Sequence, residues 1–366
     1  MKTLLSLLLL STLLFSQTDK KLTLGGVDIK KGSNVTINIE LPNLYNTPTT
    51  MPVLVMRGKH EGPVVFICAA VHGDELNGIE IIRRFRQLDI LKKLRGTVIL
   101  VPIVNIYGVM NLSRYLPDRR DLNRHFPGST HGSLASRMAD LFLNEIVKKS
   151  DLGIDLHTAS IHKSNLPQIR TNIKNPYTLK LAKAFEAPVI LHSEIRDGSL
   201  RSASQDMGVP ILLYEAGEAL RFDEQSIRIG VKGLVNVLRT NKMLPKLQKK
   251  QKAKKLPIIV RSSSWLRASQ SGVIRTIKGL GDTVKKGEII AYINEPLNDK
   301  SHKLQAPYDG IIIGKSEIPL IQEGDAVFHI ANFKKLSLAE KKILYFCEDA
   351  LENCEFIDFN DEEIIE

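Results

Sequence analysis

The chain has 366 residues, of which 43% are hydrophobic and 25% charged, which is typical of a globular protein with two domains. Its formal net charge is +11, but only 6% of the residues are aromatic and there is one tryptophan. Seven lysines and no acid fall within residues 242–255, and nine acids and no base within residues 343–366. A basic run of this kind is typical of a solvated linker, so we expect no nucleic-acid partner.

The N-terminus has the pattern of an export signal. Residues 1–16, MKTLLSLLLLSTLLFS, combine an early lysine with an apolar run that is followed by a small residue and then by polar residues. This predicts a cleaved signal peptide and an exported, periplasmic protein, with an uncleaved anchor as the alternative. No later stretch reaches the roughly 20 apolar residues of a spanning helix, so we expect no stable membrane insertion of the mature chain.

Three cysteines are too few for a disulfide framework in a chain of this length. Cys68 lies within an apolar segment and is predicted to be part of the core. Cys347 and Cys354 lie in the acidic tail, and their spacing is compatible with a disulfide or with two free thiols.

From residue 53 onward, short apolar runs alternate with helical patterns. This alternation predicts an α/β fold with a mostly parallel or mixed sheet flanked by helices. The predicted strands are residues 64–71, 97–104, 153–157, 188–192 and 209–215. Three helix faces are marked by apolar residues at three- and four-residue spacing, around residues 76–85, 134–146 and 227–238.

Composition changes at the lysine-rich stretch, which we take as the domain boundary. We predict a catalytic domain over residues 17–242 with its core at 53–240, a linker over 243–258 and a small all-β domain over 259–331. An acidic tail over 332–366 begins with a helix near Ser337. The β segment repeats a Gly-x-Ile or Gly-Ile-Ile pattern followed by Gly-Asp, and it resembles the barrel-sandwich fold of biotinyl and lipoyl domains. Lys300 is out of step with the modified lysine of such carriers, so no attached cofactor is expected.

The segment VVFICAAVHGDELNGIE carries the first candidate metal ligands. His72 ends a predicted strand and Glu75 follows at the start of a predicted helix. Gly73 permits a tight turn between them, so that both side chains are able to meet one zinc ion. Taken alone, the pair has plainer readings, namely a glutamate that complements a helix dipole and a histidine that caps a strand.

Two further predicted strands end in groups that suit hydrolysis. DLGIDLHTA ends in His157, a third ligand, and Asp155 on the same strand face either orients an imidazole or is satisfied by backbone donors. VPILLYEAGE delivers Glu215, which is placed to deprotonate metal-bound water and then protonate the leaving amine. Glu218 is its competitor, but it lies further out in the loop.

The motifs HGDE, DLNRHFPG, DLHT and YEAG resemble, in order and approximate spacing, those of the succinylglutamate desuccinylase/aspartoacylase family, relatives of zinc carboxypeptidases. The resemblance covers roughly residues 53–240. It implies one Zn²⁺ per chain held by His72, Glu75 and His157, with Glu215 as the catalytic glutamate.

The same resemblance assigns the substrate contacts. It implies that Asn123 and Arg124 hold the substrate carboxylate, that Arg114 polarises the scissile carbonyl and that Arg201 is a further carboxylate-binding arginine. The segment between Arg114 and DLNR is two residues longer than in aspartoacylase, which leaves Arg119 and Arg120 as rivals to Arg114. An arginine fork suits both tasks, because it donates two parallel hydrogen bonds and stabilises developing negative charge.

These residues predict a zinc-dependent amide hydrolase that acts on N-acyl amino acids or related carboxylate-bearing amides, through Glu-assisted attack of zinc-bound water. An exported metallocarboxypeptidase acting on peptides, including cell-wall peptides, is the alternative. A non-catalytic binding or export-adaptor protein is the third reading, but no long heptad helix lies between residues 293 and 311. The expected partner is a small anionic N-acyl amino acid or peptide. The acyl group, the leaving amine, a homo-oligomer and cobalt or manganese in place of zinc stay open.

Overall fold

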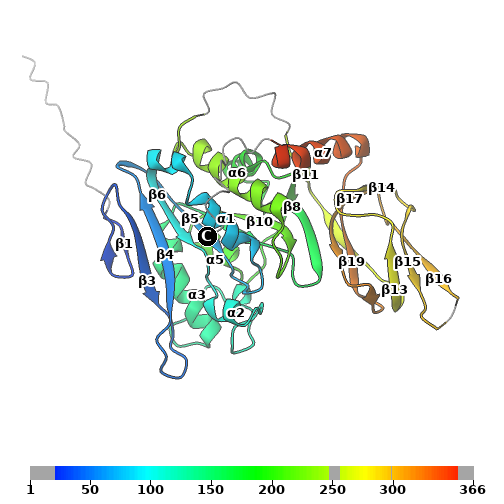
Figure 1. The fold of residues 1–366 in the computed structure, drawn as a ribbon, viewed down its shortest axis with the longest axis horizontal. Helices are drawn as coiled ribbons and strands as arrows, with labels where there is room; N and C mark the ends of the chain where they lie inside the picture. The colour runs from blue at the N-terminus through cyan, green and yellow to red at the C-terminus, as the bar shows by residue number, and fades with distance from the viewer. Residues whose placement is uncertain (1–20, 247–255, 298, 353–366) are drawn as a thin grey trace, which may run out of the picture.

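The chain folds into an N-terminal α/β region and a C-terminal β region (Figure 1). The computed structural model describes residues 21–246, 256–297 and 299–352, with side chains as far as residue 346. The N-terminal strands are β1 (Thr23–Leu24), β2 (Val27–Asp28), β3 (Asn34–Glu40), β4 (Thr50–Arg57), β5 (His60–Ala69), β6 (Arg95–Val101), β7 (Leu152–His157), β8 (Lys163–Thr171), β9 (Val189–His192) and β10 (Ile211–Glu218).

Helices connect most of these strands. They are α1 (Asn77–Phe85), α2 (Ile106–Met110), α3 (Leu134–Glu145), α4 (Pro176–Phe185), α5 (Leu200–Asp206) and α6 (Glu224–Thr240), with 3₁₀ turns η1 (Asp89–Lys93), η2 (Leu122–Arg124) and η3 (Val147–Lys149). The C-terminal β region, residues 258–332, contains β11 (Ile258–Val260), β12 (Ser263–Arg267), β13 (Gly272–Thr276), β14 (Thr283–Val284), β15 (Ile289–Asn294), β16 (Ser301–Gln305), β17 (Gly310–Ser316), β18 (Leu320–Ile321) and β19 (Ala326–Asn332). Helix α7 (Leu336–Glu352) follows it.

One mixed sheet of 13 strands runs through both regions. Its main path from edge to edge is β3, β4, β6, β5, β7, β10, β8, β17, β19 and β12. Strands β6, β5, β7 and β10 are parallel, whereas β8 returns antiparallel beside β10. The predicted α/β fold with a mixed sheet is confirmed, and the carboxyl ends of β5, β7 and β10 meet at one edge.

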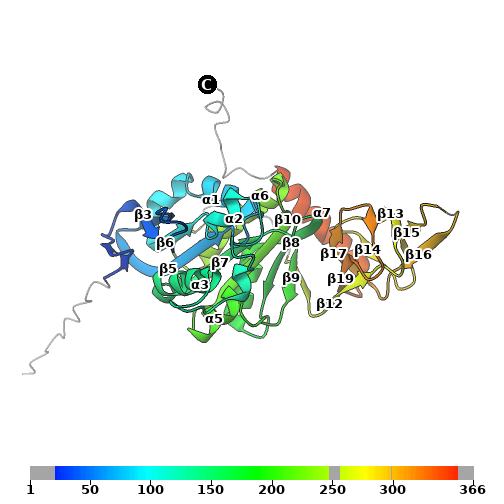
Figure 2. The same ribbon diagram turned by 90° about the horizontal axis from the view of Figure 1, so that it is seen from below.

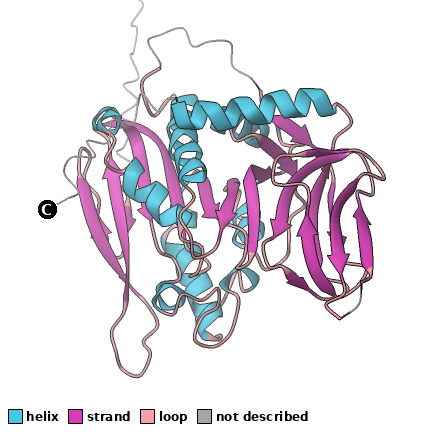
Figure 3. Cartoon of the chain, turned by 45° about the vertical axis from the view of Figure 1, so that its right-hand side comes forward, coloured by secondary structure: helices cyan, strands magenta, loops and turns pink. Residues whose placement is uncertain are grey.

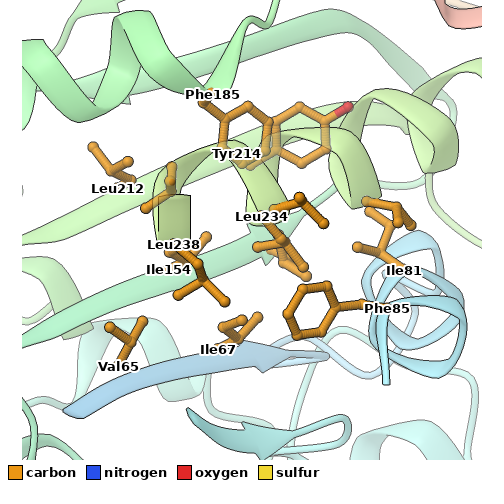
Figure 4. Close-up of a cluster of buried hydrophobic side chains, with 14 of the residues drawn as sticks. Val65, Ile67, Ile81, Phe85, Ile154, Phe185, Leu212, Tyr214, Leu234 and Leu238 are labelled. Carbon is orange, nitrogen blue, oxygen red and sulfur yellow. The ribbon is translucent and has the colours of Figure 1, made fainter. Parts of the chain in front are cut away.

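The sheet separates two hydrophobic cores because side chains alternate between its faces. Along β5, Val65 and Ile67 lie in the core with α1, α4 and α6, whereas Phe66 and Cys68 lie in the core with α3. Figure 2 shows α1 and α6 on one side of the sheet and α3 and α5 on the other. Figure 4 shows the first core, where side chains of the three helices meet those of β5, β7 and β10. Cys68 is fully buried, as predicted.

Helix α6 shows how local sequence and packing agree. Its start is capped by the side chain of Asp223, which accepts a hydrogen bond of 2.7 Å from the amide of Ser226. The apolar face predicted for this helix is buried against the sheet, with Ile227, Val231 and Leu234 all inaccessible to solvent. Packing of this face stabilises the helix more than intrinsic propensity does.

The interval predicted as a linker, residues 243–258, is packed at both ends. Met243 and Leu244 are buried in the first core, and β11 pairs in parallel with β9. Residues 247–255 lie outside the described part of the chain, as do the predicted signal peptide at 1–16 and Cys354. Strand β8 was not predicted, because KSNLPQIRT is largely polar and is interrupted by proline. Helix α4 was not predicted either. The described part of the chain contains no helix with the length and hydrophobicity of a membrane span.

The C-terminal β region has two layers, in agreement with the predicted all-β domain. A four-stranded sheet of β16, β15, β13 and β18 packs on the end of the large sheet. Ile274 and Ile293 from the first layer meet Ile312 and Phe328 from the second in a small core.

The two regions are joined through backbone pairing as well as side chains. Figure 3 shows the strands of the two regions next to each other. Strand β17 pairs antiparallel with β8, with Gly314 opposite Asn165. Nε2 of the buried Gln168 donates to the carbonyl of Ile313 at 3.2 Å. Helix α7 lies against α6 and β14, and the hydroxyl of Thr283 donates to Glu340 of α7. The sheet of the N-terminal region therefore continues, through hydrogen-bonded strands, into the C-terminal β region.

A buried histidine lies beside this junction. The ring of His329 stacks on Trp265 with centroids 4.9 Å apart, and its Nε2 lies 2.9 Å from Oγ of Ser263. Burial is the main cause that lowers the pKa of His329 to about 3, and the positive charge of Arg170 contributes to the same shift. The ring is therefore neutral in the folded protein at neutral pH.

We expect His329 to make the fold sensitive to acid. In the unfolded chain a histidine titrates near pH ~6.5, so below this value the unfolded state binds a proton that the folded state does not, and stability falls as pH falls. Between about pH 6 and about pH 4, the wild type should lose on the order of 1 kcal/mol of unfolding free energy per pH unit more than His329→Gln. Urea denaturation at several pH values measures this difference, since other titrating groups are common to both chains. Parallel pH profiles would contradict a buried, neutral His329.

Candidate metal centre and catalytic groups

Three predicted metal ligands meet at the carboxyl ends of two adjacent parallel strands. His72 follows β5, Glu75 precedes α1 and His157 ends β7, and all three are buried. Each offers a donor atom, and these atoms lie within 4.8 Å of one another. Nδ1 of His72 lies 2.7 Å from Oε1 of Glu75, and Nδ1 of His157 lies 2.8 Å from Oε2. The two imidazoles and one carboxylate suit a zinc ion and leave a coordination position for water.

Gly73, between the first two ligands, is required by close packing. A Cβ atom built at this position would lie 2.0 Å from the carbonyl carbon of Gly108 in α2. Its φ is not in the left-handed region, so the predicted tight turn does not itself require a glycine. A glycine is required because no room is left for a side chain beside Gly108.

Carboxylates hold the far side of both imidazoles. Oδ2 of Asp155 lies 2.9 Å from Nε2 of His157, and Oδ1 of Asp121 lies 3.0 Å from Nε2 of His72. A carboxylate at Nε2 favours a proton there, which leaves the Nδ1 lone pair for a metal. Two interpretations of Asp155 were open from the sequence, and this contact favours the one in which Asp155 orients a ligand imidazole.

The electrostatics keep Glu75 ionised, as a metal ligand must be. Burial alone raises the pKa of its carboxyl, but the neighbouring His72 and His157 outweigh burial and hold the pKa far below its usual range. The amide of Thr158 donates to Oε2 at 3.0 Å, and Nη1 of Arg114 lies 3.1 Å from Oε1.

Glu215 lies on β10 in register with His157 on β7. Its Oε2 accepts a hydrogen bond of 2.7 Å from Nδ2 of Asn165 and pairs with Nη2 of Arg170 at 3.1 Å. Glu218 was predicted to lie in the following loop, but it is the last residue of β10, because pairing with β8 extends the strand past Glu215. It is in register with Ser164 and pairs with Arg221 at 3.2 Å. The register therefore brings Glu215, and not its competitor, beside the candidate ligands.

Arg114 and the DLNR segment lie at the same edge of the sheet. Nη2 of Arg114 pairs with Oδ2 of Asp121 at 3.0 Å, which connects it to the residue that contacts His72. Oδ1 of Asn123 accepts from the amide of Leu200 at 2.8 Å and thereby ties this segment to α5. Burial lowers the pKa of Arg124, Asp121 opposes this, and the charges of Arg196 and Arg114 lower the pKa further. The arginines thus form a positive environment that suits an anion.

Arg201 is hydrogen-bonded to Ser193 and Glu194 and also lies near the charge of Glu215. Its Nη2 donates to Oγ of Ser193 at 3.0 Å and to the carbonyl of Glu194 at 2.6 Å, while its buried Nη1 has no hydrogen-bond partner among the described residues. Burial and Arg170 lower its pKa, whereas Glu215 raises it, so Arg201 lies within reach of their charges.

Arg201 also lines an open cavity of about 650 Å³ with Asp151 and Ile211, at the opposite ends of β7 and β10 from the candidate ligands. A second open cavity, of about 620 Å³, lies between β4 and η1. Neither is lined by His72, Glu75 or His157. Donor atoms that converge on one point define a metal site better than hollow volume does, so the candidate metal centre is the site formed by these three residues.

Three residues at this site were missed in the sequence. Asp121 precedes the predicted Asn123 and Arg124, so its place in DLNR was a usable signal. Asn165 and Arg170 lie on β8, which has no motif and no regular apolar pattern, and no local signal indicates them.

A sheet of this order with these groups at its strand ends defines a zinc carboxypeptidase-like α/β fold. Residues 61–241 match the family model described as succinylglutamate desuccinylase/aspartoacylase catalytic domain. This part of the chain belongs to the succinylglutamate desuccinylase/aspartoacylase family, as its motifs predicted.

Individual relatives agree with this assignment. The N-alpha-acetyl-L-2,4-diaminobutyric acid deacetylase of Halomonas elongata is 25% identical over 292 residues, which cover 77% of this chain and 85% of the deacetylase. The product-bound structure of the ectoine utilization protein EutE (DoeB) from Ruegeria pomeroyi shares the fold, with a TM-score of 0.74, 23% identity and coverage of 83% of this chain and 97% of that one. A succinylglutamate desuccinylase/aspartoacylase from Rhodobacter sphaeroides has a TM-score of 0.73 at 24% identity, with the same coverage.

Proposed function

We propose that this protein is a zinc-dependent amide hydrolase that removes the acyl group from an N-acyl amino acid or a related carboxylate-bearing amide. The convergence of His72, Glu75 and His157 beside Glu215 carries this proposal. The family's name and that of the Halomonas deacetylase support deacylation. Export to the periplasm, inferred from residues 1–16, is part of the same proposal.

His72, Glu75 and His157 would hold one zinc ion per chain. The residues fit this ion, because three donor atoms of suitable type lie together and a carboxylate holds the Nε2 of each imidazole. Bound zinc supplies the Lewis acid that activates water and polarises an amide carbonyl.

Glu215 would move the proton in this reaction. Water adds to the acyl carbon and loses a proton to Oε1 of Glu215, the C–N bond breaks, and the same proton passes to the leaving nitrogen. Arg114 would stabilise the negative charge that develops on the carbonyl oxygen. Asn123 and Arg124 would hold the substrate carboxylate, with Arg201 as a further positive group.

The test is a screen of the purified, zinc-loaded chain on N-acetyl and N-succinyl amino acids against peptides of the same residues. We expect kcat/KM for an N-acyl amino acid to exceed that for the peptides by roughly tenfold or more. Turnover of peptides alone would make the protein a carboxypeptidase, and no hydrolysis of either class would refute the proposed function.

Amidating the substrate carboxylate should lower kcat/KM by roughly 10²-fold, because a charge-assisted bidentate pair contributes on the order of 3 kcal/mol. Arg124→Ala should cause a comparable loss with the acidic substrate and little further loss with the amidated one. Steady-state kinetics of the four combinations measure the coupling. Arg120→Ala is the matched control, since Arg120 lies in the same loop but pairs with Asp118, whereas Arg114, for which it was the rival, is the arginine that contacts Glu75. Losses that simply multiply would show that Arg124 does not contact this carboxylate.

A further inference from the structure

Glu215 is held by two donors that meet a single oxygen. Nδ2 of Asn165 donates to Oε2 at 2.7 Å, and Nη2 of Arg170 pairs with the same atom at 3.1 Å. Among the described residues, no hydrogen bond reaches Oε1. The carboxylate is therefore anchored through one oxygen, and the other is available to exchange a proton.

Asn165 is in turn placed by the C-terminal β region. It is buried on β8, with Gly217 of β10 as its register partner on one side and Gly314 of β17 on the other. A Cβ atom built on Gly314 would lie 2.9 Å from Oδ1 of Asn165 and 3.1 Å from Cβ of His329. Any residue larger than glycine at position 314 would therefore press on the amide that holds Glu215.

We infer that Asn165 and Gly314 are positioning residues for Glu215, so that docking of the C-terminal β region on β8 sets the orientation of the proposed base. This inference rests on the proposed role of Glu215. Strand β8 lies between β10 and β17, so the backbone pairing on both sides fixes where the Asn165 side chain begins. The space left by the missing side chain of Gly314 then determines where the side-chain amide of Asn165 lies.

Kinetics of Asn165→Ala, Gly314→Ala and the double variant test the inference. A hydrogen bond to a charged group contributes roughly 10- to 100-fold, so Asn165→Ala should lower kcat by that factor while KM changes by less than about threefold. Gly314→Ala should lower kcat in the native background and cause almost no further loss in the Asn165→Ala background, where the crowded atom is gone. Losses in kcat that multiply, or a loss confined to KM, would overturn the inference.

Gly310→Ala is the matched control. Gly310 is also a crowded glycine of β17, but a Cβ there would lie 2.4 Å from the carbonyl oxygen of Ala331, within the β region. Its effect on kcat and on the melting temperature should be the same in the native background and in the Asn165→Ala background. Equal coupling of Gly310 and Gly314 to position 165 would mean that Gly314 acts only through general stability.

Melting temperatures of the same variants test, independently of activity, whether a side chain at position 314 crowds Asn165. Gly314→Ala should lower Tm by several degrees in the native background and by much less with Asn165→Ala. If Gly314→Ala folds only in the Asn165→Ala background, the crowding is confirmed, and if it folds in neither, His329 sets the space and the inference fails. A wild type without hydrolytic activity but with this coupling in Tm would refute the proposed function and leave the placement of Asn165 by Gly314 standing.

Discussion

Glu215→Gln is expected to keep the fold and the metal while kcat falls by roughly 10²- to 10⁴-fold. Glutamine is isosteric with glutamate, and its carbonyl oxygen still accepts from Asn165 and Arg170, so the contacts at Oε2 survive. The amide cannot take a proton from water, so the step assigned to Oε1 is lost. Steady-state kinetics, zinc content and melting temperature of the same preparation separate these effects.

Glu218→Gln is the matched control for this variant. Glu218 lies on the same strand and is equally shielded, but it pairs with Arg221 and is in register with Ser164. Its replacement should leave kcat within a few-fold of the wild type, since it takes no part in proton transfer. A crippled Glu218→Gln together with an active Glu215→Gln would show that the base was assigned to the wrong residue.

His72→Ala and His157→Ala are expected to lose both zinc and turnover. The wild type should contain about one zinc per chain, and removing one of three protein ligands leaves too few donors for tight binding. Asp155→Asn should weaken zinc binding by roughly 10- to 100-fold, because Asp155 orients His157 through Nε2. Elemental analysis after gel filtration and a chelator competition measure the two effects.

His302→Ala provides the comparison histidine, since it lies in the β region and pairs with Glu295. It should retain full zinc content and activity. Metal-free protein that remains active in chelator would refute the metal centre altogether, whatever the variants show.

The positions of the candidate metal ligands were predictable because their placement follows from local pattern and one general rule. His72 and His157 each end a short apolar run, and parallel strands bring their carboxyl ends to a common edge. Glu215 follows by the same rule from β10. The buried face of α6 was predictable in the same way, from apolar residues spaced at three and four positions.

The side chains that hold Glu215 could not be predicted from the sequence, because their positions depend on tertiary structure. Asn165 and Arg170 reach Glu215 because β8 runs antiparallel between β10 and β17, and this position results from pairing with segments about 50 and about 150 residues away. A largely polar strand with a central proline gives no local signal for such pairing. Strand ends and amphipathic faces are encoded within a few neighbouring residues, so the sequence by itself determined the fold class and the candidate ligands. Only the folded chain decided which side chains orient them, because those contacts join residues that no local pattern relates.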